Sequence, residues 1–159
     1  MKGGNGMGDR TRALDLVYEL VLLLGDDMRR ALARDGLTES RATLLWHLDQ
    51  RGPSTQRALA DALGVSPRNV TGLVDALEAA GFVQRGQHPT DRRATLVTLT
   101  ELGSQTMADM VRDRELIASQ LVADFGEDQL MEFGRSLDTV TGRLRDLVES
   151  THSPTPVTA

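Results

Sequence analysis

Two short helix-like segments joined by a three-residue turn, between residues 56 and 81, constrain the fold more than any other feature of the sequence. Gly64 ends the first segment, because glycine readily adopts the left-handed conformation in which many helices stop. Ser66 and Pro67 mark the start of the second, since serine is a favoured N-cap and proline a favoured first helical residue. Two helices of these proportions are typical of a helix-turn-helix.

The N-terminal residues of the second segment have side chains suited to reading DNA. In a helix-turn-helix the second helix enters the major groove and offers its first residues to base edges. Arginine can form two hydrogen bonds with guanine, and asparagine can form two with adenine. The candidate residues for this role are Ser66, Pro67, Arg68, Asn69 and Thr71. Taken alone, the pattern also fits two packed helices without a role in DNA binding, so the neighbouring segments decide between these interpretations.

A polar, basic hairpin is predicted immediately after this pair of helices. Residues 82–85 and 94–99 have the composition of strands, and the Gly, Pro, Thr and Asp residues between them are typical of a turn. A basic ribbon after a recognition helix is a wing, whose arginines are attracted by the negative potential of the minor groove. The expected wing residues are Arg85, Asp91, Arg92 and Arg93. Asp91 would hold a neighbouring arginine in one rotamer, although an isolated Asp-Arg-Arg turn would be a solvated surface loop.

Long helices with broad apolar surfaces are predicted on both sides of this central part. The first covers about residues 11–34, and two more cover about 101–124 and 126–149. In the last helix the apolar residues recur in steps of three and four, which is close to the pattern of a coiled-coil seam. These helices have more apolar surface than the core of one chain of this length requires, which favours association with a second copy.

The composition excludes several classes of protein. The chain has no cysteine, which excludes disulfides, a cysteine nucleophile and any zinc site that contains cysteine. Its three histidines are far apart in sequence, and it has no nucleophile motif or phosphate-binding glycine loop, so we expect no metal, no cofactor and no enzyme activity. No apolar run approaches the roughly 20 residues that span a membrane. The start lacks the apolar segment of a signal peptide, so the expected location is the cytoplasm.

The net charge of −5 is unevenly distributed along the chain. Residues 52–99 hold five basic and four acidic residues, whereas residues 101–149 hold five basic and eleven acidic residues. An acidic chain is not by itself expected to bind nucleic acid. The least acidic part, however, is the one whose basic residues lie where a surface facing DNA would need them.

The stretch from Ala58 to Gly103 resembles the multiple antibiotic resistance regulator (MarR) family. The similarity rests on Leu-Gly-Val-Ser at 63–66, on Leu-Val-Asp-Ala-Leu-Glu at 73–78, and on Pro-Thr-Asp-Arg-Arg at 89–93 followed by Leu-Thr-Glu-Leu-Gly. The resemblance implies a homodimer that binds double-stranded DNA at a pseudo-palindromic operator. It also implies a repressor that releases DNA when a small anionic or aromatic effector binds.

The expected fold is therefore mainly α with a small β-hairpin wing: a winged helix-turn-helix plus a helical dimerisation region. The winged domain would cover residues 38–100, and the dimerisation region would combine residues 10–36 with 101–149. Residues 1–9 are expected to form a flexible N-terminus, and residues 151–159 a disordered tail. The residues expected in the dimer interface are Leu14, Val17, Leu130, Phe133, Leu137, Val140, Leu144 and Leu147.

An effector site is an expectation that comes from the family resemblance. Tyr18, Trp46 and His47 are the candidates nearest the expected site, and Arg12 and Arg41 could offer charge to an anion. The alternative is that the two aromatic residues belong to the core. A regulator without a small-molecule effector and a winged helix that binds only other proteins also remain open. Steep salt dependence would favour DNA over a protein partner.

One position departs from the family pattern. Many members have a basic residue after the position that corresponds to Thr71, whereas this chain has Gly72. Glycine weakens a helix and supplies no phosphate contact. It either allows a close approach to DNA or weakens binding, and the sequence does not decide between the two.

Overall fold

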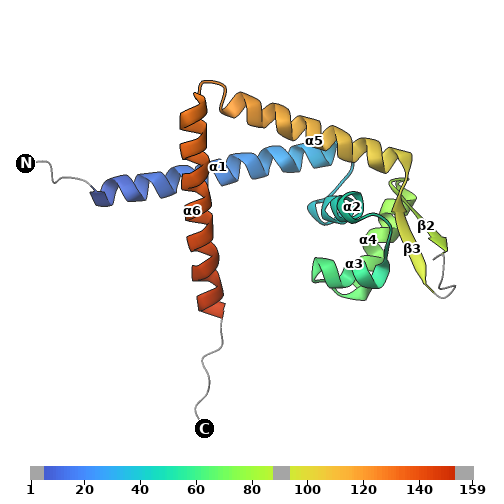
Figure 1. Cartoon of the computed structure of the whole chain (residues 1–159). Helices are drawn as coiled ribbons and strands as arrows, with labels where there is room; N and C mark the ends of the chain where they lie inside the picture. The colour runs from blue at the N-terminus through green and yellow to red at the C-terminus, as the bar shows by residue number, and fades with distance from the viewer. Residues whose placement is uncertain (1–5, 88–93, 153–159) are drawn as a thin grey trace, which may run out of the picture. The chain divides into compact units, whose positions relative to one another are not determined.

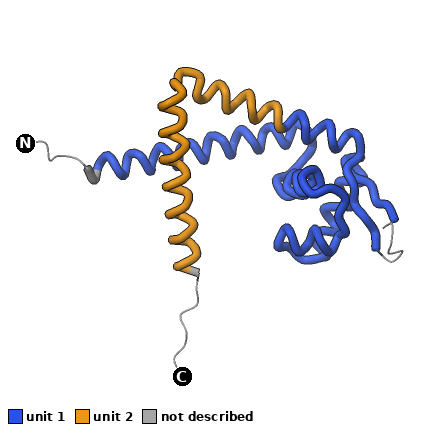
Figure 2. Tube along the Cα trace, viewed as in Figure 1, with its two compact units in different colours: residues 1–110 blue, residues 111–159 orange. Residues whose placement is uncertain are grey.

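A computed structural model describes residues 6–87 and 94–152 of the chain (Figure 1). In chain order the elements are α1 (Gly6–Arg34), α2 (Glu39–Arg51), β1 (Ser54–Thr55), α3 (Gln56–Leu63), α4 (Pro67–Ala79), β2 (Val83–Gln87), β3 (Thr95–Leu99), α5 (Glu101–Leu121) and α6 (Glu127–His152). The chain divides into two units, residues 1–110 and residues 111–159, and α5 passes from one into the other (Figure 2). The mainly helical fold with a small β-sheet confirms the predicted fold class.

The helix boundaries in unit 1 follow from local capping. Thr38, Thr55 and Ser66 each accept a hydrogen bond from the backbone N–H three residues later, at 3.4, 3.2 and 3.2 Å. Each cap thereby satisfies one of the N–H groups that a helix start leaves without a partner. Gly64 ends α3 in the left-handed conformation with φ of 64°. The predicted end of the first helix of the pair at Gly64 and the predicted start of the second at Ser66 and Pro67 are therefore confirmed.

The sheet has three strands, one more than the sequence predicts. Strand β3 lies in the middle and pairs antiparallel with β2 on one side and β1 on the other. Val97 is opposite both Arg85 and Ser54. Thr55 caps α3, and Ser54 immediately before it pairs with β3 as part of β1. A two-residue strand has no pattern of its own, and it forms here because a neighbouring strand offers unpaired backbone groups.

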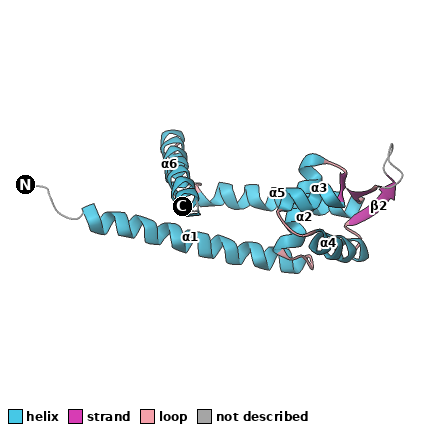
Figure 3. Ribbon diagram, turned by 90° about the horizontal axis from the view of Figure 1, so that it is seen from below, coloured by secondary structure: helices cyan, strands magenta, loops and turns pink. Residues whose placement is uncertain are grey.

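The core of unit 1 lies between the helix-turn-helix, α2 and the sheet. Figure 3 shows α2, α3 and α4 gathered beside the strands near the C-terminal end of α1. The side chains with almost no exposed surface are Leu44, Leu45, Leu59, Val70, Val74, Leu77, Val83, Val97 and Met107. Burying each aliphatic side chain contributes about 1.5–3 kcal/mol. Leu32 near the end of α1 and Met107 in α5 join this core, so both helices are anchored in unit 1.

Most of α1 lies outside this core. The helix begins at Gly6, so residues 6–9, expected to be flexible, are helical, with Asp9 in the first turn where it complements the helix dipole. Many of its large apolar side chains remain exposed, including Leu22 with 67% of its surface accessible. No helix in the described ranges is both long and apolar enough to cross a membrane.

Unit 2 contains the end of α5 and the whole of α6. The rings of Phe125 and Phe133 contact each other edge to face, with centroids 5.6 Å apart, beside the turn that joins these helices. Helix α6 ends at His152, so residues 151 and 152, expected in the tail, are helical, and the remainder of the tail lies outside the described residues. Its apolar side chains are largely exposed, as in α1.

Candidate DNA-binding surface

The predicted base-reading residues share the outward face of α4. Val70, Val74 and Leu77 recur at helical spacing and are completely buried, which turns the opposite side of the helix to solvent. The exposed positions include all five candidates, namely Ser66, Pro67, Arg68, Asn69 and Thr71. The buried stripe thereby fixes which side chains α4 can offer to a ligand.

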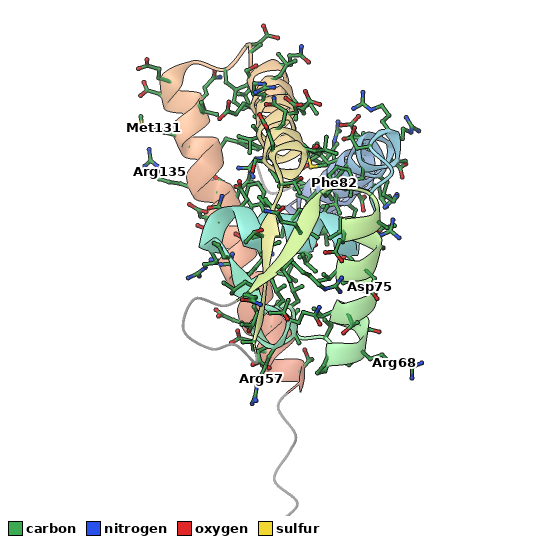
Figure 4. The ribbon with its side chains drawn as sticks, turned by 90° about the vertical axis from the view of Figure 1, so that its right-hand side faces the viewer. Arg57, Arg68, Asp75, Phe82, Met131 and Arg135 are labelled. Atoms are coloured by element: carbon green, nitrogen blue, oxygen red, sulfur yellow. The ribbon has the colours of Figure 1, made fainter. Side chains whose placement is uncertain are left out.

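Two arginines at this end of unit 1 have exposed side chains. Arg68 on α4 and Arg57 on α3 both point away from the unit in Figure 4. Within residues 6–87 and 94–152, neither side chain has an ion pair. Arg57 also lines a cavity of about 370 Å³ beside β3. Arg57 is not among the residues predicted to contact DNA, because a single arginine near a helix start has no distinguishing pattern.

Arg85, an expected wing contact, joins β2 to the recognition helix. Its guanidinium forms ion pairs with Asp75 and Glu78 of α4, and its backbone N–H donates to Glu78 Oε1 at 3.1 Å. The hydrogen bond with Asp75 raises the pKa of Arg85 above its ordinary value, against the lowering effect of burial. Arg85 therefore stays charged and ties the strand to the helix, and a role in direct DNA contact stays a prediction.

The same network reaches a residue on the exposed face of α4. Thr71 Oγ1 donates to the Pro67 carbonyl oxygen at 3.0 Å, so it accepts a hydrogen bond from the amide of Gln56 at 3.2 Å. With its amide nitrogen turned to Thr71, Gln56 presents Oε1 to Arg85 and accepts hydrogen bonds from Arg85 Nη2 and Nε, at 3.1 and 3.2 Å. A continuous chain of hydrogen bonds therefore connects β2, the start of α3 and the hydroxyl of Thr71. Asp91, Arg92 and Arg93 lie outside the described residues.

Gly72 interrupts the side chains on the exposed face of α4. A glycine inside a helix costs about 1 kcal/mol relative to alanine. Gly72 is exposed, and a Cβ built on it would meet no heavy atom within 4 Å. The protein therefore has space for a side chain here and accepts a less stable helix without one.

The effector candidates fall into separate places. Trp46 and His47 line one cavity of about 550 Å³, together with Arg51 and other residues of α2 and Leu63 of α3. Arg41 does not line this cavity, and its guanidinium donates to the Gly36 carbonyl oxygen at 3.4 Å. Arg12 and Tyr18 are exposed on α1 and do not line it either.

The alternative that both aromatic residues belong to the core is wrong. Tyr18 is 62% exposed and Trp46 40% exposed. Neither spacing nor composition could have shown this, because the periodicity of a helix does not tell how many of its faces are covered. Across the described parts of the chain, no three His, Asp or Glu side chains gather as a metal ion would require.

Comparison with sequences of known proteins identifies relatives. The profile of the MarR family matches residues 37–95. YcgE of Bacillus subtilis (strain 168), an uncharacterized HTH-type transcriptional regulator, is 29% identical over 102 residues, which cover 64% of this chain and 64% of YcgE. The HTH-type transcriptional repressor NicR of Pseudomonas putida is 36% identical over 75 residues, or 47% of this chain and 48% of NicR. The matched segment spans less than two thirds of either relative.

Solved structures share the fold over most of their length. YusO from Bacillus subtilis has a TM-score of 0.73 at 20% identity and covers 86% of this chain and 94% of its own. A point mutant of S. aureus MepR, solved with a bound oligodeoxyribonucleotide, has a TM-score of 0.68 at 19% identity, with 83% and 97% covered. The family match over residues 37–95 places the winged helix-turn-helix part of the chain in the MarR family, and the solved structures share its fold.

Proposed function

We propose that the chain is a sequence-specific transcription regulator that inserts α4 into the major groove of double-stranded DNA. The observation that supports this most strongly is the exposed polar face of α4, where Arg68 has no ion pair among the described residues, while Val70, Val74 and Leu77 bury the opposite face in the core. The Arg85 network supports it further, because it sets the position of α4 against the wing. MepR has a similar fold, and its mutant was solved bound to an oligodeoxyribonucleotide, which supports DNA binding by this fold.

The regulator acts as a homodimer on a pseudo-palindromic operator. The exposed apolar residues of α1 and α6 support this, since soluble monomers rarely leave large contiguous apolar surfaces in contact with water. The proposed interface residues are Leu14, Val17, Leu130, Phe133, Leu137, Val140, Leu144 and Leu147. A two-fold axis would present two copies of α4 to successive major grooves, about 34 Å apart. By analogy with the repressor NicR, the expected effect on transcription is repression.

Replacing Arg68 by alanine tests the role of α4. We expect affinity for the preferred duplex to fall by roughly tenfold to a hundredfold, because one specific groove contact is worth about 1–3 kcal/mol. Fluorescence anisotropy should compare the duplex upstream of the protein's own gene with a scrambled duplex, at roughly 50 and 200 mM salt. Arg30 on α1 is exposed and has no ion pair in the described residues, so Arg30→Ala is the matched control.

The two duplexes separate a base contact from a phosphate contact. Loss of binding on the preferred duplex alone supports base reading by Arg68, whereas equal loss on both indicates a phosphate contact. If Arg68→Ala binds DNA as tightly as the Arg30→Ala control, then Arg68 does not contact DNA. Binding by the wild-type protein that is weak, insensitive to salt and equal for both duplexes would favour the protein-interaction alternative.

A small aromatic anion is the proposed effector, and the cavity beside Trp46 is its proposed site. The indole supplies an apolar contact, while His47 and Arg51 supply polar and positively charged groups. Trp46 is the only tryptophan of the chain, so intrinsic fluorescence reports directly on this cavity. Saturable quenching by benzoate, weakened at least roughly fivefold in Arg51→Gln, is the expected result, since a charge-assisted contact is worth about 1.5–3 kcal/mol.

Two further measurements decide where the effector binds and whether one exists. Arg30→Gln should leave the quenching by benzoate unchanged, because it removes the same charge outside the cavity. Release of DNA by benzoate without quenching would place the site elsewhere. If neither fluorescence nor DNA affinity responds to benzoate or to larger aromatic carboxylates, the regulator without an effector is favoured.

A further inference from the structure

The packing of the protein does not explain the glycine in the middle of the recognition helix. Gly72 has an ordinary helical backbone, which alanine adopts more readily. A Cβ at this position would meet nothing within 4 Å, whereas a Cβ at Gly103 would lie 2.2 Å from the Phe82 carbonyl oxygen. Within the described part of the chain, neither a turn nor a close approach requires glycine at position 72.

The position of Gly72 on the helix suggests an external reason. Residues three and four apart are neighbours on a helix surface, so Gly72 lies between Arg68 and Asp75 on one line. All three are exposed, whereas Val70 and Val74 face the core. The glycine therefore opens a gap in the side chains that cover α4, and the backbone is accessible through this gap.

The gap affects how deeply α4 can enter the major groove, because a helix with its side chains is about as wide as the groove. A helix with its side chains is about 10–12 Å across, and the major groove is about 12 Å wide, so each side chain on the contact line limits how deeply the helix enters. We propose that Gly72 is the point where the backbone of α4 touches the bases, and that it sets the depth at which Arg68 and Thr71 reach base edges. This inference rests on the DNA-binding function proposed above.

The opposite interpretation makes a different prediction about charge. If Gly72 only marks the loss of a basic side chain that would reach a phosphate, then lysine at this position should strengthen binding. If Gly72 is a contact point, lysine should weaken binding in spite of its charge, because the longer side chain keeps the helix away from the bases.

The experiment measures stability and DNA affinity on the same variants. Gly72→Ala should raise the melting temperature by about 2–4 °C, as expected for a gain in helix propensity. Its affinity for the duplex that the wild-type protein selects from a random-sequence library should fall roughly tenfold or more, as for loss of one base contact. Gly72→Lys should bind less tightly still. Gly142→Ala on α6 is the matched control, because Gly142 is also helical with open space around it, and no proposed interface residue is three or four positions away.

The control should show the same rise in melting temperature with unchanged DNA affinity, at an oligomeric state verified by light scattering. If Gly72→Ala binds like the wild type while Arg68→Ala loses affinity, the contact at Gly72 is overturned and the DNA-binding function stands. Tighter binding by Gly72→Lys than by the wild type also overturns it, in favour of a missing phosphate contact. If the wild-type protein selects no duplex, the proposed function fails, and the contact at Gly72 fails with it.

Discussion

Gly103→Ala is expected to destabilise unit 1 by about 3 kcal/mol or more and to lower its melting temperature by roughly 6–12 °C. A Cβ on Gly103 would lie 2.2 Å from the Phe82 carbonyl oxygen and 3.2 Å from Leu99 Cδ2. The nearer obstacle is backbone, so it cannot yield by a change of rotamer. Either the start of α5 or the segment that leads into β2 must move.

That movement would break a compact set of hydrogen bonds. Thr100 N–H donates to the Phe82 carbonyl oxygen at 3.0 Å, and Thr100 Oγ1 donates to the Gly81 carbonyl oxygen at 2.6 Å. The same hydroxyl accepts from Gly103 N–H at 3.1 Å, which caps α5. Because these bonds join the residues after α4 to the start of α5, overpacking here is expected to disturb both the candidate DNA-binding surface and α5.

Circular dichroism during heating, at one fixed protein concentration, measures the effect. Gly72→Ala is the matched control, since it is the same chemical change at a helical glycine with open space, and it is expected to raise the melting temperature. A melting temperature of Gly103→Ala within about 2 °C of the wild type, less than a 1 kcal/mol effect produces, would show that the close approach to Phe82 is relaxed in solution.

Replacing Leu137 and Leu144 on α6 by glutamate is expected to convert the proposed dimer into monomers or aggregates. Both side chains belong to the line of apolar residues that recurs in steps of three and four along the helix. A charge buried without a partner costs several kcal/mol. Two of them should therefore raise the dissociation constant of the dimer by at least roughly a thousandfold. Light scattering over a range of protein concentrations measures the change.

A second double variant controls for added charge. Met131 and Thr139 are exposed on α6, and no residue of this line is three or four positions from either, so Met131→Glu with Thr139→Glu adds the same two charges outside the proposed seam. The control should remain dimeric. A stable dimer of the Leu137 and Leu144 variant would place the interface on other surfaces, such as the exposed apolar residues of α1. Monomers of both variants would indicate charge repulsion along α6 in place of a specific seam.

Those features of the candidate site that depend only on residues close along the chain could be predicted from the sequence. The apolar spacing of Val70, Val74 and Leu77 determines which face of α4 is buried, and the exposed face then follows from helix geometry. Arg68 and Asn69 could be selected because their position next to a helix start and their chemistry both depend on sequence alone. The pairing of Arg85 with Asp75 and Glu78 could not be selected. Its partners are ten and seven residues away, and a strand and a helix meet there only after folding.

The helix-turn-helix, its caps and the two longer strands follow from the amino-acid sequence, because each depends on propensities and on contacts between residues close along the chain. Three features depend on the packing of the folded chain: Ser54 pairs with β3, Trp46 lines a cavity outside the core, and Gly103 lies against Phe82. Each of these depends on the distance between segments separated in sequence. That distance is set by how the whole core packs, and no local pattern encodes it.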